Sequence, residues 1–142
     1  MDKSVQKAIK PNLQLSHRRF TKAQRLLTAQ DFKQVFDHTA FKVHTTHLLF
    51  FVRVRHDQNA PNRLGLAIAK KKIKRAHERN RLKRLLREYF RQYQAQLPCV
   101  VEMAVIAKQD VSNCDNVDLL AQIAQAFEKI TRKSLKMQRS NV

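Results

Sequence analysis

Residues 63–93 read RLGLAIAKKKIKRAHERNRLKRLLREYFRQY, and this stretch decides the fold. From 63 to 69, larger apolar side chains alternate with Gly65, Ala67 and Ala69, which is the period of a strand. The face made of these small residues allows another element to approach closely. From 76 to 94, leucine and aromatic side chains recur at the spacing of an amphipathic helix. The stretch therefore predicts a strand and a long helix joined by a Lys-rich turn.

Further strands lie on either side of this unit. Residues 41–54 read as extended, with the even-numbered residues from 48 to 54 on a fully apolar face and a mixed face opposite. This segment can split into two strands near Thr45-Thr46. Residues 99–107 form a near-continuous apolar run, which is typical of a central strand buried on both faces.

Two more helices complete the pattern. Thr28 and Asp31 resemble a capping box, with Asp in place of the usual Glu or Gln, so a short helix should run from about 29 to 38. Its apolar stripe is Phe32, Val35 and Phe36. A last helix should run from about 115 to 136. Its expected core stripe is Leu120, Ile123, Ala124, Phe127 and Ile130.

The element order is therefore α-β-β-β-α-β-α, an α+β fold built as a single-domain α-β sandwich. We expect the folded domain at residues 25–136, a basic flexible arm at 1–24 and a tail at 137–142. Basic arms of this kind often order only when they bind nucleic acid. The alternative for the arm is a tail without a role.

Charge is the unusual property of the chain, because 29 Lys and Arg face 11 Asp and Glu, for a net charge of +18. The excess is concentrated: residues 1–25, 70–91 and 128–142 carry +6, +9 and +4, and the remaining residues sum to −1. Concentrated positive charge is typical of a surface that docks a polyanion.

In the helix predicted after residue 76, a helical wheel places most cations on one side and the apolar residues on the other. Such a row of guanidinium and ammonium groups suits the phosphates of a folded RNA. Three alternatives are a solvated basic face, a membrane-surface helix and a calmodulin target. The acidic partners of a solvated face are nearly missing, since Glu78 and Glu88 lie off the row, and the apolar side is needed to cover a sheet.

At these residues the sequence resembles the ribonuclease P protein family. The resemblance rests on the Arg79-Asn80-Arg81 segment with basic residues following at helical spacing, and on the Lys-rich lead-in after a strand ending Gly-Leu-Ala-Ile-Ala. It extends to residues 32–36 of the first helix and covers roughly residues 25–135 in element order. The long basic segment before residue 25 departs from some members of the family.

The resemblance implies two RNA-binding sites. The residues that would contact the catalytic RNA subunit are Lys71, Lys72, Arg75, Arg79, Asn80, Lys83, Arg84 and Arg87. A cleft between the first helix and the sheet would hold the 5′ leader of precursor tRNA, with Phe32, Phe36 and Phe50 as its aromatic residues. For these phenylalanines, simple core packing is the alternative. The resemblance also implies an unusual left-handed β-α-β crossover.

Enzyme chemistry of the chain's own is not indicated by the sequence. One glycine rules out a Gly-rich phosphate loop, His44 and His47 point to opposite faces of an extended segment, and Cys99 and Cys114 have no metal-binding spacing. No nucleophile cluster or carboxylate pair is evident. We therefore expect no catalytic residues and no metal site on the protein, with Mg²⁺ acting through the RNA subunit as the resemblance implies.

The expected partners are the catalytic RNA subunit and precursor tRNA, with one monomeric protein per RNA. No stretch approaches the roughly 20 apolar residues of a membrane span, and we expect a cytoplasmic protein. The alternative functions are a basic ribosomal protein and a DNA-binding regulator. The regulator would need a recognition helix free to enter a groove, whereas here the basic helix is anchored to a sheet along its length.

Overall fold

The computed structural model describes residues 20–140, with side chains described to residue 138. Most of the arm predicted at 1–24, and the end of the tail predicted at 137–142, lie outside the described residues. The helices are α3 (Ala29–Asp37), α4 (Ala76–Tyr93) and α5 (Asn116–Ser140), with short 3-10 turns η1 (Lys22–Gln24) and η2 (Gln94–Gln96). The strands are β1 (Phe41–His44), β2 (Leu48–Arg55), β3 (Arg63–Ala67) and β4 (Val100–Ala107).

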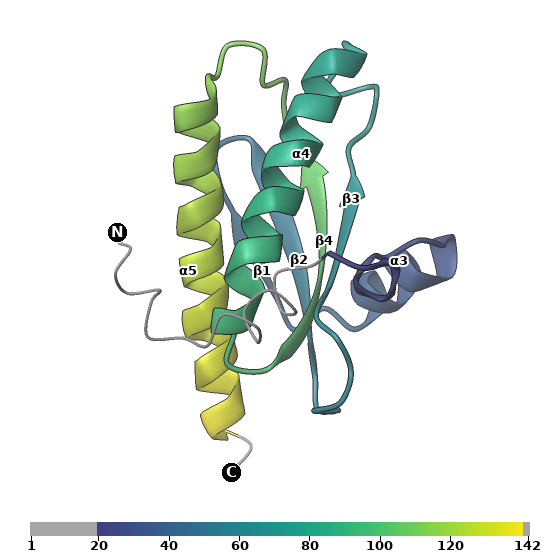
Figure 1. The fold of residues 1–142 in the computed structure, drawn as a ribbon, viewed down its shortest axis with the longest axis vertical. Helices are drawn as coiled ribbons and strands as arrows, with labels where there is room; N and C mark the ends of the chain where they lie inside the picture. The colour runs from purple at the N-terminus through teal and green to yellow at the C-terminus, as the bar shows by residue number, and fades with distance from the viewer. Residues whose placement is uncertain (1–19, 141–142) are drawn as a thin grey trace.

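The four strands form one mixed sheet in the order β1-β2-β4-β3 (Figure 1). β2 pairs antiparallel with β1 and β4, and β3 pairs parallel with β4. The predicted element order is confirmed, including the split of residues 41–54 into two strands and the central place of β4. The split falls at Thr45, whose backbone N–H donates to the carbonyl of Leu48 at 2.9 Å and closes a tight turn.

The connection from β3 through α4 to β4 is left-handed. In Figure 1, α4 lies in front of the sheet, and the chain passes from β3 on the right to its parallel neighbour β4 on the left. Nearly all such crossovers are right-handed. The family resemblance therefore predicted correctly a feature that general topology rules exclude.

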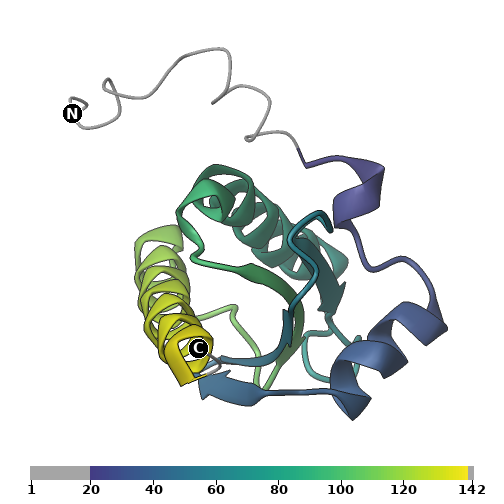
Figure 2. The ribbon, with the colours of Figure 1, turned by 90° about the horizontal axis from the view of Figure 1, so that it is seen from below.

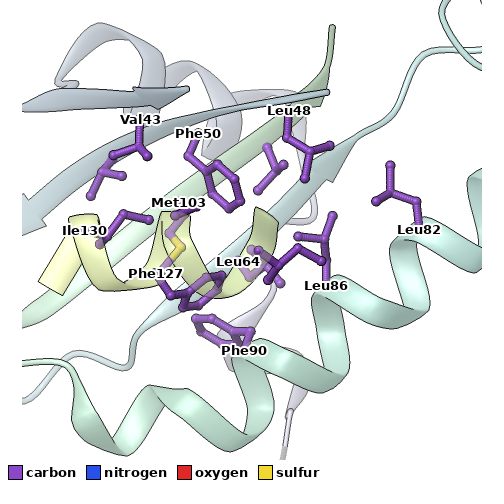
Figure 3. Close-up of a cluster of buried hydrophobic side chains, with 14 of the residues drawn as sticks. Val43, Leu48, Phe50, Leu64, Leu82, Leu86, Phe90, Met103, Phe127 and Ile130 are labelled. Carbon is purple, nitrogen blue, oxygen red and sulfur yellow. The ribbon is translucent and has the colours of Figure 1, made fainter. Parts of the chain in front are cut away.

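One face of the sheet carries the main core, covered by α4 and α5 (Figures 2 and 3). Leu82, Leu86 and Phe90 of α4 are fully buried at intervals of four residues. The stripe predicted for α5 needs two corrections: Leu120 is 38% exposed while Leu119 is fully buried, and Ala124 is half-buried while Ala126 is fully buried. Residue 119 faces the sheet because the helix begins at Asn116, where Asp115 caps it through a 2.8 Å bond from the backbone N–H of Asp118.

The other face of the sheet is crossed by α3 alone (Figure 2). The capping box that starts α3 is present, with Thr28 accepting from the N–H of Asp31 and Asp31 accepting from the N–H of Thr28, both at 3.1 Å. Under this helix lies the glycine of β3: a Cβ added to Gly65 would stand 2.6 Å from the Cβ of Leu26 and 2.7 Å from the ring of Phe32. The small-residue face of β3 thus permits the close approach expected from the sequence.

On this face of the sheet, the buried carboxylate of Glu102 pairs with arginines from neighbouring strands. Glu102 of β4 is 1% exposed and accepts from Arg53 at 3.2 Å and Arg55 at 3.0 Å, with Arg63 at 3.5 Å. Arg63 also reaches Asp31 at the start of α3, at 3.1 Å. Three strands and a helix are therefore joined through one cluster in which the buried charge is paired.

Residues 20–24, assigned to the arm from sequence, pack against the folded domain. The ring of Phe20 meets that of Phe90 edge-on at 5.6 Å, and η1 follows directly. Arg25 then forms an isolated parallel bridge with Leu64, beside β3 at the edge of the sheet. No helix among the described residues is long and apolar enough to cross a membrane.

Candidate nucleic-acid interface

The side of α4 turned away from α5 carries a row of cations. α4 meets α5 through its opposite side, where Tyr89 lies 5.0 Å from Phe127. In the row, Lys83 is half-buried and Arg84 and Arg87 are exposed, and no acidic side chain within residues 20–140 pairs with any of the three. Buried leucines on the other side fix the helix against the sheet, so the row is rigid and open to solvent.

The Lys-rich turn before α4 is held in a defined shape. Ile73 is fully buried and anchors the turn, while Lys71, Lys72 and Arg75 are exposed. Arg79 donates from one guanidinium nitrogen to the carbonyls of Ile73 at 2.9 Å and Lys74 at 2.8 Å. Arg79 therefore positions the turn from within, in addition to lying at the edge of the cationic row.

A hollow of about 590 Å³ separates this turn from the loop between β4 and α5. It is lined by Lys72, Lys74, Arg75, Asp110, Ser112 and Asn113. Lys74 was absent from the predicted set, although its place within the Lys-rich run was visible in the sequence. The eight predicted residues thus lie on one continuous segment, formed by the turn and the outer side of α4, with exposed Asn80 among the cations.

Arg81 belongs to a different set of contacts. It donates to Glu78 and Asn116 and to the carbonyls of Val111 and Cys114, each at 2.9 Å. These bonds join α4 to the β4–α5 loop and to the start of α5. The Arg81 guanidinium therefore stabilises the packing of these segments and is not part of the cationic row.

A second surface lies between α3 and the sheet. Phe32 and Phe36 stack with ring centroids 6.3 Å apart, and Phe36 meets Phe51 of β2 edge-on at 4.9 Å. Phe36 is 40% exposed, and the ammonium of Lys42 lies 5.3 Å from the centroid of the Phe51 ring. Aromatic rings with a cation beside them are what unpaired bases and their phosphates require.

Phe50, assigned to this cleft from sequence, lies elsewhere. It is fully buried on the α4–α5 face, where its ring meets Phe127 at 6.0 Å (Figure 3). Successive strand residues point to opposite faces, so once α3 covers the mixed face of β2, Phe51 faces α3 and Phe50 faces the core. The sequence showed both faces of β2, but α3 could have covered either.

His47 and Cys114 belong to one hydrogen-bonded network with Gln122. Gln122 accepts from the backbone N–H of His47 at 3.1 Å, its amide nitrogen lies 2.9 Å from Nδ1 of His47, and Nε2 of His47 lies 3.1 Å from Sγ of Cys114. Burial raises the pKa of the Cys114 thiol, which favours the protonated thiol over the thiolate. No group of three His, Cys, Asp or Glu side chains within residues 20–140 is placed to hold a metal ion.

The cationic turn and helix match a known family. A family model described as Ribonuclease P covers residues 20–131. This chain belongs to the ribonuclease P protein family. The ribonuclease P protein component of Acinetobacter baylyi is 42% identical over 120 residues, covering 84% of this chain and 89% of the relative. That of Chromohalobacter salexigens is 40% identical over 118 residues, covering 83% and 90%.

Solved structures agree with the ribonuclease P fold. The RNase P protein of Thermotoga maritima superimposes with a TM-score of 0.61 at 25% identity, covering 76% of this chain and 96% of that one. The RNase P protein of Staphylococcus aureus gives a TM-score of 0.66 at 21% identity, covering 75% and 94%. The resemblance found in the sequence is therefore confirmed for the family and for the fold.

Proposed function

We propose that this chain acts as the protein subunit of a bacterial ribonuclease P, the endoribonuclease that removes the 5′ leader of precursor tRNA. The observation that carries this function is the rigid cationic row of α4, in a chain that belongs to the ribonuclease P protein family. The active site lies in the RNA subunit. The protein contributes binding and orientation, and alone it is inactive.

The turn at 70–75 and the outer side of α4 bind the catalytic RNA. Arg84 and Arg87 offer planar forks that can hold a phosphate by two bonds, and Lys71 and Lys72 act as point charges. Asn80 can both donate and accept, so it suits a 2′-hydroxyl or a base edge. Because the helix is fixed to the sheet, these groups meet the RNA already ordered, which lowers the entropic cost of association.

The cleft beside α3 binds the unpaired 5′ leader. Phe36 and Phe51 offer ring faces on which bases stack with little sequence preference, and Lys42 neutralises a phosphate. Phe32 supports Phe36 from the next turn of the helix. A protein that serves many precursors needs this tolerance of leader sequence.

Mg²⁺ acts through the RNA subunit in this proposal. Every step that this proposal assigns to the protein is a binding step. The assembly contains one monomeric protein per catalytic RNA, acts on precursor tRNA and resides in the cytoplasm.

Reconstitution tests the function. The purified protein is combined with a bacterial catalytic RNA and assayed on precursor tRNA at low Mg²⁺. We expect the protein to raise the cleavage rate of the RNA and to cleave nothing alone. Hydrolysis by the RNA-free protein that persists through repurification would overturn the accessory role, and co-sedimentation with ribosomes without any effect on cleavage would favour a ribosomal protein.

Leader length tests the cleft. Phe36→Ala should weaken binding of a precursor with a leader of several nucleotides by about 1–3 kcal/mol and leave a nearly leaderless precursor unchanged. Leu27→Ala is the matched control, because Leu27 is also an exposed apolar residue, at 53%, and precedes the helix. An equal loss of affinity for both substrates, together with a lower melting temperature of the variant protein, would show that Phe36 only packs in the fold.

A further inference from the structure

A second cationic stripe runs along the C-terminal half of α5, away from the row on α4. At 100° per residue, the four exposed residues that form it share one side of the helix. They are Lys129, Arg132, Lys133 and Lys136. Thr131, whose hydroxyl lies 2.8 Å from that of Tyr93 on α4, points to a different side. The stripe therefore faces solvent on the side of α5 that α4 does not cover.

One acidic side chain lies beside the stripe, because Glu128 and Arg132 line the same hollow next to Tyr93. Glu128, the one acidic residue in this half of α5, lies about a quarter turn away from the centre of the stripe. Within the described residues, Lys129, Arg132 and Lys133 make no ion pair. Three cations stand along roughly 6 Å of helix with one acidic neighbour, a concentration of positive charge expected of a surface that meets a polyanion.

A continuous line of contacts joins this stripe to the cleft. From Phe36 in the cleft, the line passes to Phe51 at 4.9 Å and on to the ammonium of Lys42 at 5.3 Å. Lys42 follows Phe41 in β1, the edge strand of the sheet, so the two side chains point to opposite faces. On the far face, the ammonium of Lys133 lies 5.8 Å from the Phe41 ring. Figure 2 shows β1 passing beside the C-terminal end of α5.

We propose that the upstream part of the 5′ leader leaves the cleft over β1 and binds the stripe on α5 through its phosphates. This proposal rests on the leader occupying the cleft, as proposed above. The line alternates rings and cations around a sheet edge, which suits a flexible single strand that stacks bases and pairs phosphates in turn. A rigid duplex could not follow it, because the path turns from one face of the sheet to the other.

The stripe also lies at the limit of what the family model describes. That model ends at residue 131, whereas α5 continues to Ser140, so Arg132, Lys133 and Lys136 stand beyond the matched region. Lys129 lies inside the matched region, so the stripe spans its end. The stripe lies on α5, whereas the row proposed for the catalytic RNA lies on the side of α4 turned away from α5, so the two surfaces can be tested separately.

Substrate titrations of the reconstituted holoenzyme test this path. Three precursors are compared: one nearly leaderless, one with a leader of about four nucleotides and one with a leader of about twelve. The double variant Lys129→Gln/Lys133→Gln should bind the longest leader about five- to tenfold more weakly, and its log–log salt slope for that substrate should fall by about 1.4, since single-strand contacts contribute about 0.7 each. Binding of the two shorter substrates should not change.

Two further variants separate this proposal from the cleft. Lys22→Gln, which removes an exposed charge from η1 near the β3 edge, is the control and should bind all three substrates as the wild type does. Phe36→Ala should weaken both leader-bearing substrates. If it does so while the double variant binds the longest leader normally, the cleft stands and the α5 path is wrong. An equal loss on all three substrates from the double variant would also overturn the path. If Phe36→Ala affects none of the substrates, the cleft itself is wrong.

Discussion

At the scale of single residues, the cations of α4 divide into those that hold the fold and those that face solvent. Arg81 makes bonds to two side chains and two backbone carbonyls. Arg79 donates from one guanidinium nitrogen to two backbone carbonyls of the turn before the helix. Arg84 and Arg87 have no protein partner within residues 20–140. The sequence could separate the row from the core stripe, but not Arg79 from Arg84, because the carbonyls that Arg79 meets are placed by the fold.

Arg81→Ala should therefore destabilise the protein, while Arg84→Ala should not. Removing the Arg81 guanidinium leaves the half-buried carbonyls of Val111 and Cys114 without this donor, and we expect a loss of about 1–3 kcal/mol in the free energy of unfolding. Arg84→Ala should keep the wild-type stability and weaken assembly with the catalytic RNA. Urea unfolding followed by circular dichroism measures the first effect, and RNA titration the second. Equal unfolding midpoints for the two variants would contradict the assignment of Arg81 to the fold and of Arg84 to RNA binding.

At the scale of elements, the sequence predicted most of the fold because each helix and strand carries its own signal. The capping residues Thr28 and Asp31 mark the start of α3 in the sequence. The 3.6-residue spacing of the apolar side chains in α4 is visible in the sequence without any tertiary information. Side-chain alternation likewise separates the two faces of β2. It does not say which face α3 will cover, and this choice places Phe51, not Phe50, beside Phe36 of α3. The handedness of the β3–α4–β4 connection is equally a property of the assembled sheet.

The start of α3 should show a defined dependence on pH. Burial raises the pKa of Asp31, but the backbone N–H groups of Leu27 and Thr28 and the charge of Arg63 lower it more, so its pKa lies below the ordinary 3.8. A carboxylate with a lowered folded pKa contributes stability that is complete above the unfolded value and is lost as the pH falls through the folded value.

Asp31→Asn should accordingly reduce the free energy of unfolding at neutral pH by about 0.5–1 kcal/mol, the usual range for a charge at a helix N-terminus. This difference from the wild type should stay constant down to the ordinary value of 3.8 and shrink below it. Denaturant unfolding at a series of pH values measures it. Asp110→Asn is a suitable control, because Asp110 is an exposed carboxylate in the β4–α5 loop, away from α3. A difference that persists undiminished in acid would assign the effect of Asp31 to packing.

At the scale of the whole molecule, the sheet separates the proposed binding surfaces. The cationic row lies on α4, and the aromatic residues proposed to bind the leader lie on the opposite face of the sheet, which α3 covers; Figure 2 shows α4 and α3 on the two sides of the sheet. In the proposal, one small domain therefore holds a structured RNA and a single strand at the same time. The charge pattern of the sequence sufficed to predict that the cations share one side of α4, since a run of cations at helical spacing is local. The second surface depends on residues from α3, β1 and β2, which only the folded chain brings together.

This arrangement makes a quantitative prediction about salt. The association of the protein with the catalytic RNA should weaken steeply with salt, because each phosphate neutralised on a helical RNA contributes about 0.9 to the log–log slope, as for duplex DNA. Lys83→Gln should lower the magnitude of the slope by about that amount. Asn80→Ala should weaken binding while leaving the slope unchanged, because Asn80 carries no charge and lies among the cations of the same helix. Filter-binding titrations at several salt concentrations give both quantities for each variant. A slope near zero, or one that Lys83→Gln and Asn80→Ala alter alike, would mean that the α4 row does not dock by pairing its charges with phosphates.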